Sequence, residues 1–231
     1  MTDFSQSAPG LEPPTVVDHV LIPVADVDES ARRFCERYGL QGIAGGEHPN
    51  AGTANFIVPL GQQYLELIGI VNHERAAVSR LGGRISAAVR AASPILGWAL
   101  RTANLDALRS KLLKASWQLP PIAKGSRRRP DGRLLRWRTQ DIAVGPEVSA
   151  FPFVIEWQLP MDLHPGLSEP WFHARQPSLR QVVVGTRDVG VTESRLRTLL
   201  GNSDLYAVRE SDRDAVERVV IHAEGGDVVI E

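Results

Sequence analysis

The sequence predicts an α+β fold built from three repeated βαβββ units. An apolar, strand-like run followed by an amphipathic helix with a polar cap occurs three times. Each helix is followed by short strand-like segments, and the last of these carries a glutamate in every unit. At 231 residues and 43% hydrophobic, the chain can bury a core as one or two domains.

The first unit spans residues 16–72 and gives the clearest pattern. Residues 16–24, VVDHVLIPV, are typical of a buried strand. Asp26 and Glu29 resemble the capping box of a helix that ends at Gly39. Strand-like segments follow, separated by glycine-rich or polar turns, at residues 41–48, 52–60 and 62–70.

The other two units repeat this order. In residues 94–159, Asn104 caps the helix, and the strands 132–140 and 151–159 follow a long loop that contains proline and arginine. In residues 178–231, Asp188 begins the helix and a Gly-Gly turn joins the last two strands as a hairpin. His19 lies seven residues before Asp26, and Gln181 lies seven residues before Asp188.

Three segments lie outside the units. Residues 1–15 are expected to form a flexible N-terminal tail. Residues 73–93 are predicted to be a helical connector, interrupted at Gly82 and Gly83. Residues 160–177 are rich in proline and are expected to be irregular.

Charge and composition exclude several classes of partner. The net charge is −1, which gives no electrostatic basis for binding nucleic acid or an anionic membrane. The one basic cluster, GSRRRPDGR at residues 125–133, is interpreted as a solvated loop, with the binding of a negatively charged ligand as the alternative. A single cysteine, Cys35, and the lack of a long apolar run or signal pattern predict a cytoplasmic protein.

Two polar residues interrupt apolar strands. His19 lies within the first strand, and Glu66 lies in the segment QQYLELIGI. Because side chains alternate along a strand, both point away from their apolar neighbours. A buried carboxylate must be paired or bound to a metal. The two residues therefore either hydrogen-bond to each other or form part of a metal site.

The glutamate recurs in all three units. Glu66, Glu156 and Glu231 each follow two apolar residues in a terminal strand, and this recurrence favours the metal site. One histidine with two or more glutamates suits a divalent Zn, Ni, Mn, Fe or Co ion that keeps open coordination positions.

These residues carry a resemblance to a known family. Repeated βαβββ units with His in the first strand and Glu in the last resemble the vicinal oxygen chelate superfamily. Residues 48–69, HPNAGTANFIVPLGQQYLELIG, and 152–157, PFVIEW, resemble its glyoxalase-like family. The resemblance implies that two units pair into a curved mixed sheet, a cup that holds a metal ion chelated by two adjacent substrate oxygens.

The resemblance implies two possible ligand sets. Gly97 stands where the second unit would supply its first ligand. Pairing of the first two units leaves His19, Glu66 and Glu156, with Glu156 also as the catalytic base. Pairing of the first and third units adds Gln181 and Glu231 to His19 and Glu66. Sequence adjacency favours the first two units, and the third then packs outside or forms a homodimer contact.

Further residues are candidates for binding substrate. His48, Thr53 and Asn55 belong to the glyoxalase-like segment, although Asn and Thr there can simply satisfy turn backbone. Trp98 and Trp157 flank the candidate site as aromatic walls, although a strand Trp is more often core. His173 is a weaker candidate for a residue that caps the site. The remaining histidines are interpreted as surface residues: His73, His164 and His222.

The sequence thus predicts a metal-dependent enzyme of the lyase, isomerase or dioxygenase type that acts on a small oxygenated organic molecule. A metal-free binding or sequestration protein on the same fold is the alternative, and an interaction module that uses its sheet edges is a third possibility. The substrate and the reaction are not predicted.

Overall fold

The structure is a computed structural model that describes residues 15–142, 150–167 and 176–231. The expected N-terminal tail, apart from Thr15, and His173 lie outside the described residues. The strands are β1 Val16–Pro23, β2 Ile43–His48, β3 Thr53–Leu60, β4 Gln63–Ile70, β5 Gly97–Arg101, β6 Ala123–Arg128, β7 Leu134–Asp141, β8 Phe153–Trp157, β9 Ser178–Thr186, β10 Tyr206–Glu210, β11 Ala215–Ala223 and β12 Gly226–Ile230. The helices are α1 Val27–Tyr38, α2 His73–Ala77, α3 Arg80–Arg90, α4 Leu105–Lys114 and α5 Val189–Leu200, with 3-10 turns at Met161–Leu163 and Pro165–Leu167.

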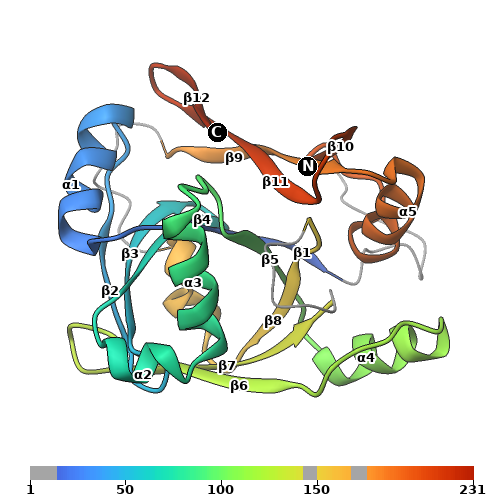
Figure 1. The fold of residues 1–231 in the computed structure, drawn as a ribbon, viewed down its shortest axis with the longest axis horizontal. Helices are drawn as coiled ribbons and strands as arrows, with labels where there is room; N and C mark the ends of the chain where they lie inside the picture. The colour runs from blue at the N-terminus through green and yellow to red at the C-terminus, as the bar shows by residue number, and fades with distance from the viewer. Residues whose placement is uncertain (1–14, 143–149, 168–175) are drawn as a thin grey trace, which may run out of the picture.

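Strands β1 to β8 close into one barrel in the order β1-β4-β3-β2-β6-β7-β8-β5 (Figure 1). Within each half the first strand runs parallel to the last, as β1 does to β4 and β5 to β8. The halves join through antiparallel contacts of β1 with β5 and of β2 with β6. The predicted α+β fold with a curved mixed sheet formed by the first two units is therefore confirmed.

Strands β9 to β12 form a separate sheet with a different order, β10-β9-β11-β12. In the first half the last strand, β4, lies beside β1, whereas β12 pairs with β11 and not with β9. The short strand β10 occupies the parallel position beside β9 instead. The third segment has the predicted order of elements along the chain, but its sheet is not arranged like those of the first two.

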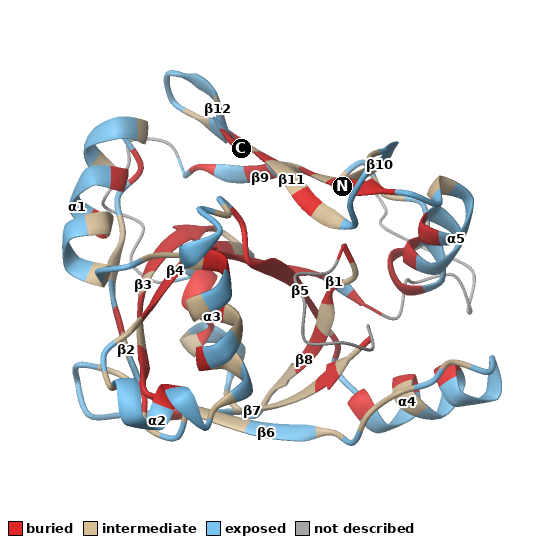
Figure 2. Ribbon diagram, in the orientation of Figure 1, coloured by how far each residue is buried: buried red, intermediate tan, exposed pale blue. Residues whose placement is uncertain are grey.

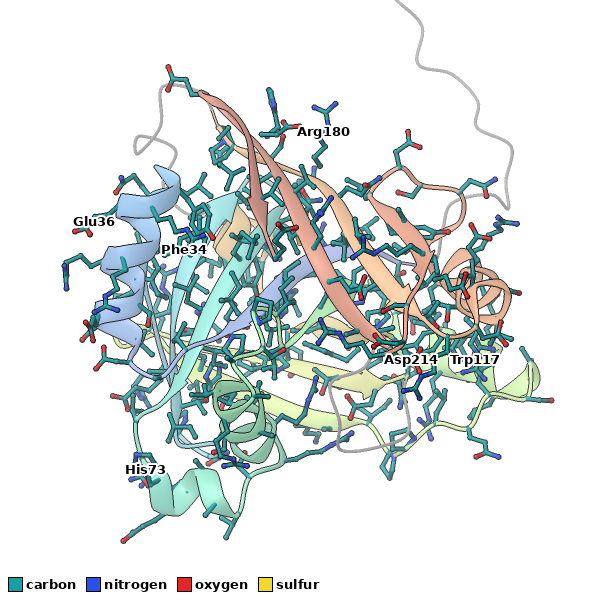
Figure 3. The ribbon with its side chains drawn as sticks, turned by 45° about the horizontal axis from the view of Figure 1, so that its top comes forward. Phe34, Glu36, His73, Trp117, Arg180 and Asp214 are labelled. Carbon is teal, nitrogen blue, oxygen red and sulfur yellow. The ribbon has the colours of Figure 1, made fainter. Side chains whose placement is uncertain are left out.

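A polar side chain caps the N-terminus of each of the three helices predicted for the repeated units, at the residue that the sequence predicts. Asp26, Asn104 and Asp188 each accept a hydrogen bond from a backbone N–H three residues later. Gly39 ends α1 in the left-handed conformation, with φ of 67°. In Figure 3, Phe34 points from α1 toward the strands and Glu36 points away from them.

The connector between the halves breaks at a different place from the one predicted. Helix α2 ends before Val78, and Ser79 caps α3, so Gly82 lies inside α3. A Cβ at Gly82 would collide with the backbone of Ala76, so the glycine lets the two helices pack closely. The predicted interruption at Gly82 and Gly83 is therefore wrong: both glycines lie within α3, and Gly82 is a packing residue.

The buried residues gather on the barrel strands and beneath the sheet of β9–β12 (Figure 2). One core cluster joins the outer face of the barrel, at residues such as Val17 and Leu100, to Val182 and Val219 of that sheet. A smaller cluster seats Ile85 of α3 against Leu21 and Ile68 of the barrel. Helix α3 is thereby fixed beside the barrel interior.

The candidate active site

The barrel encloses a cavity of about 250 Å³ that both halves line. The first half contributes polar side chains: His19, His48, Asn55, Tyr64 and Glu66. The second half contributes mainly aromatic and apolar ones: Trp137, Phe153, Ile155 and Trp157. Helix α3 adds Arg80, Leu81 and Arg84, so the cavity joins polar and apolar walls from three parts of the chain.

His19 contacts the buried carboxylate of Asp18 through its Nδ1 atom. Its Nδ1 lies 2.6 Å from Oδ1 of Asp18, while Oδ2 of Asp18 accepts from Trp157 Nε1 at 3.2 Å and lies 3.0 Å from His164 Nε2. The register of β1 shifts between Val17 and His19, and Asp18 and His19 are both buried there. Burial alone would raise the pKa of Asp18, but its bonds to His164 and His19 hold that pKa well below the usual range.

Glu66 lies close to His19 in the cavity lining. His19 Nε2 lies 3.5 Å from Oε2 of Glu66, and both side chains are buried. Asn55 donates to Oε1 of Glu66 and accepts from Nη1 of Arg127 at 3.0 Å. Asn55 therefore fixes the carboxylate and connects it to a guanidinium group from β6.

His48 is a neutral member of this group. Its Nδ1 lies 3.1 Å from Thr53 Oγ1, and its Nε2 lies 3.8 Å from Oε1 of Glu66. Burial lowers the pKa of His48 to about 4, although Glu66 acts in the opposite direction. At neutral pH the imidazole is therefore uncharged.

The structure brings together most of the candidates from the first half. His19, Glu66, His48 and Asn55 line one cavity, and Thr53 supports His48. From the second half Trp157 also lines the cavity. Trp98 does not: it is 1% exposed in the core, and its Nε1 donates to the carbonyl of Ala150.

Glu156 lies on the other face of its strand, contrary to the predicted ligand set. Phe153, Ile155 and Trp157 of β8 line the cavity, so the side chain between the last two points outward. There Glu156 accepts from the backbone N–H of Leu105 at the start of α4 and pairs with Arg138 at 2.6 Å.

Strand register explains why the alignment of glutamates placed Glu156 wrongly. Leu21, two residues after His19, pairs with Glu66. Ala99, two residues after Gly97, pairs with Phe153. Phe153 therefore takes the place of Glu66 in the second half, and the match of Glu156 to Glu66 was shifted by an odd number of residues, which reverses the face.

The alternative ligands of the third unit lie outside the cavity. Nε2 of Gln181 donates to the carbonyl of Asp204 at 3.4 Å, and the Glu231 carboxylate pairs with Arg218 at 2.8 Å. Both residues belong to the segment of the separate sheet, so the set His19, Glu66, Gln181 and Glu231 does not assemble within this chain.

Several residues of the site were not predicted from the sequence, among them Asp18, Tyr64, Trp137 and Phe153. His164 was expected at the surface but is fully buried against Asp18, whereas His73 and His222 are exposed as predicted (Figure 3 for His73). Arg127 lies in β6 and is 4% exposed, although its basic cluster was interpreted as a solvated loop. Arg84 reaches the cavity from α3. Of His164, Arg127 and Arg84, only Arg127 is indicated by the sequence, through the alternative interpretation of the basic cluster as a site for a negatively charged ligand.

The side chains at the site do not fit the predicted three-ligand metal centre. A catalytic divalent ion usually takes three protein ligands. Within residues 15–142, 150–167 and 176–231, no group of three or more His, Cys, Asp or Glu side chains is arranged to hold one. Nε2 of His19 and Nε2 of His48 approach opposite oxygens of Glu66, at 3.5 Å and 3.8 Å, and a Cβ at Gly97 would lie 3.3 Å from the Arg84 guanidinium rather than beside a ligand.

The chain belongs to the family of the glyoxalase-like domain, whose model matches residues 17–200. This match confirms the resemblance to the vicinal oxygen chelate superfamily. A hypothetical protein from Staphylococcus aureus shares the fold, with a TM-score of 0.74 and 17% identity over 93% of this chain and 98% of that one.

Methylmalonyl-CoA epimerases are also among the similar structures. The enzyme from Streptomyces coelicolor has 15% identity and a TM-score of 0.45 over 63% of this chain and 99% of its own. That from Mycobacterium tuberculosis has 18% identity and a TM-score of 0.45 over 65% and 91%. No curated protein sequence matches the chain. Among the described residues no helix is long and apolar enough to cross a membrane.

Proposed function

We propose that the protein is an enzyme of the isomerase or lyase type that moves a proton on a small oxygenated organic molecule held in the barrel cavity. The observation that carries this proposal is the pair of His19 Nε2 and Glu66 Oε2, 3.5 Å apart and both facing the cavity. Membership of the glyoxalase-like family supports a small-molecule enzyme of this kind.

The surroundings of the pair suit a proton transfer. Asp18 is ionised and binds Nδ1 of His19, which places the imidazole proton on Nδ1 and leaves the Nε2 lone pair toward the cavity. Glu66 is the second proton acceptor, oriented by Asn55. Two acceptors this close can serve two neighbouring atoms of one substrate.

A reaction follows from this arrangement. The Glu66 carboxylate takes a proton from a carbon next to a carbonyl group, and the electron pair of the C–H bond moves onto the carbonyl oxygen as an enolate forms. Where that carbon carries a hydroxyl group, Nε2 of His19 accepts the hydroxyl proton and returns it to the former carbonyl oxygen. The carboxylic acid of Glu66 then protonates the former carbonyl carbon, and the oxygen that lost its proton becomes the new carbonyl group. In a 2-oxo acid without that hydroxyl, the carboxylic acid of Glu66 returns a proton to the same carbon, which is exchange alone. No step involves a metal ion, because the donor set does not fit one.

The test is proton exchange in D₂O, followed by NMR as loss of the C–H signal beside the carbonyl in 2-oxo acids, 2-hydroxy acids and thiol adducts of 2-oxoaldehydes. Glu66→Gln should slow exchange by about 10²- to 10⁴-fold, because an amide cannot accept the proton. Glu156→Gln is the matched control and should retain exchange. Equal rates for Glu66→Gln and the wild type would exclude Glu66 as the base.

Metal analysis of the purified protein tests the same proposal independently. We expect exchange to survive a chelator. Stoichiometric divalent metal that is lost in His19→Ala/Glu66→Ala, together with activity that needs the metal, would show that the predicted metal enzyme is correct and the proposal wrong.

Sequestration of an aromatic ligand is the second candidate function. Trp137 and Trp157 pack edge to face with ring centroids 5.3 Å apart, and both line the cavity. This wall can hold a flat ligand without any chemistry. Tight binding with no exchange by the wild type, for every compound of the panel, would favour it.

The homodimer, the cytoplasmic location and the unit boundaries stay predictions.

A further inference from the structure

Two guanidinium groups at the cavity have unused hydrogen-bond donors. Arg127 is 4% exposed, and its Nη1 donates to Asn55, but its Nε has no partner among the described residues. Arg84 donates from Nη2 to the carbonyl of Leu96 at 3.3 Å, and its buried Nε also lacks a partner within the described ranges. Buried donors are nearly always hydrogen-bonded, so the Nε atoms of Arg127 and Arg84 are each expected to bind an acceptor.

The cavity also has more positive than negative side chains. Its lining contains the guanidinium groups of Arg80, Arg84 and Arg127 and, among the described residues, the carboxylates of Glu66 and Asp141. Asp141 pairs with Arg80, so among the described lining carboxylates Glu66 alone remains to balance Arg84 and Arg127, and it reaches Arg127 only through Asn55. A buried guanidinium without a matching anion is unfavourable. Burial accordingly lowers the pKa of Arg127.

The backbone is shaped to admit both side chains. A Cβ at Gly45 of β2 would collide with Nη1 of Arg127 and with Oδ1 of Asn55. Gly97 has φ of +153°, and a Cβ there would lie 3.3 Å from Nη2 of Arg84. Glycines at these two strand positions therefore leave room for the two guanidinium groups.

We infer that the cavity binds a small carboxylic acid, with the carboxylate on Arg127 and a further oxygen of the ligand toward Arg84. The planar guanidinium offers paired N–H donors that match a carboxylate, and such charge-assisted pairs are strong in a buried site. The apolar body of the ligand lies against Phe153, Ile155 and Trp157. A 2-oxo or 2-hydroxy acid with an apolar side chain meets these requirements. The inference names the substrate class of the proposed proton transfer and therefore rests on that function.

Calorimetric titration tests the inference directly. The probes are phenylpyruvate and 4-methyl-2-oxopentanoate, each compared with its neutral amide, and inorganic phosphate. The wild type should bind at least one acid about 10-fold or more tightly than its amide, and phosphate more weakly than that acid. Arg127→Gln should remove the preference for the acid. Arg128→Gln, on the same strand but exposed, is the matched control and should keep it.

Thermal unfolding separates recognition from a structural role. Arg127→Met removes the buried guanidinium together with its hydrogen bond to Asn55, so without ligand it should melt somewhat below the wild type. The acid should raise the melting temperature of the wild type but not of Arg127→Met. Arg84→Gln should show a smaller loss of acid binding and serves as the second variant should Arg127→Met fail to fold.

Equal affinity of each acid and its amide for the wild type, no saturable binding of either acid, or an undiminished acid preference in both Arg127→Gln and Arg84→Gln would overturn the inference. Tighter binding of phosphate than of both acids would assign the guanidinium groups to a phosphate and equally reject the carboxylate. Because these are binding measurements, failure here leaves proton exchange by His19 and Glu66 to be judged by its own assay.

Discussion

The two halves of the barrel share strand order and pairing but differ in what they present to the cavity. The first half offers His19 and Glu66, where the corresponding residues of the second half are Gly97 and Phe153. In both halves the first strand lies parallel to the last. One half therefore supplies the proposed proton-transfer groups, and the other supplies an aromatic wall together with Arg127.

The difference shows how a fold keeps buried polar groups satisfied. Asp18 binds His19 within the first half and His164 beyond it, and Asn55 binds both Glu66 and Arg127, so the polar groups of the first half are satisfied by one another and by a few side chains from the rest of the chain. A second polar wall would need its own complete set of partners, because each buried group left unbonded is destabilising. With the His–Glu pair confined to the first half, more of the second half's lining is apolar.

Asp18→Asn is expected to have the largest effect on the stability of the polar half. It removes the carboxylate that binds His19 and His164, and loss of one partner of a buried charged network destabilises by about 3–5 kcal/mol. Urea unfolding measures the change, and Asp141→Asn, at the more exposed pair with Arg80, should change stability by less than about 1 kcal/mol. Equal effects of the two variants would show that the polar network has no special role.

The pH dependence of stability sharpens the comparison next. The pKa of His48 falls from 6.5 to about 4 on folding, so between these values the unfolded state binds the extra proton. The contribution is fully present above pH 6.5 and is lost as the pH falls toward 4, by about 3 kcal/mol. The free energy of unfolding of the wild type, compared with that of His48→Gln, should diverge across this window. Parallel curves would contradict the assignment.

Below this window Asp18 adds a second loss. Its pKa is depressed on folding, so its contribution is present above about pH 4, the usual carboxyl pKa, and disappears as the pH falls further. Acid unfolding of Asp18→Asn should accordingly lack the steepest part of the wild-type curve, and an unchanged slope below pH 4 would count against the Asp18 network.

Glu156→Gln probes the outer face of the apolar half and should have a smaller effect. It weakens the bonds to the N-terminus of α4 and to Arg138, so the free energy of unfolding should fall by less than it does in Asp18→Asn. Proton exchange should be unchanged because Glu156 does not line the cavity. A loss of exchange as large as that of Glu66→Gln would place Glu156 in the reaction after all.

The separate sheet should tolerate change best. Gln181→Ala and Glu231→Ala each remove contacts of partly or fully exposed side chains, so we expect shifts in unfolding free energy within about 0.5 kcal/mol and no change in exchange. Loss of exchange in either variant, with folding intact, would bring the third unit back into the site.

The sequence by itself determined the local structure and the polar half of the site. Caps at Asp26, Asn104 and Asp188 and the periodicity of the strands depend on neighbours in the chain, so they could be predicted. His19 and Glu66 stood out because a titratable group in an apolar strand needs a partner, wherever that partner comes from.

Tertiary structure decided the rest, because strand register and sheet order depend on residues far apart in sequence. A match of apolar residues could not show that Glu156 faces outward, since a shift of one residue reverses the face of a strand. Nor could it show that β10 and not β12 lies beside β9. His164 and Arg127 come from a proline-rich connector and a basic cluster with no periodic pattern, and only the closed barrel gives them buried partners.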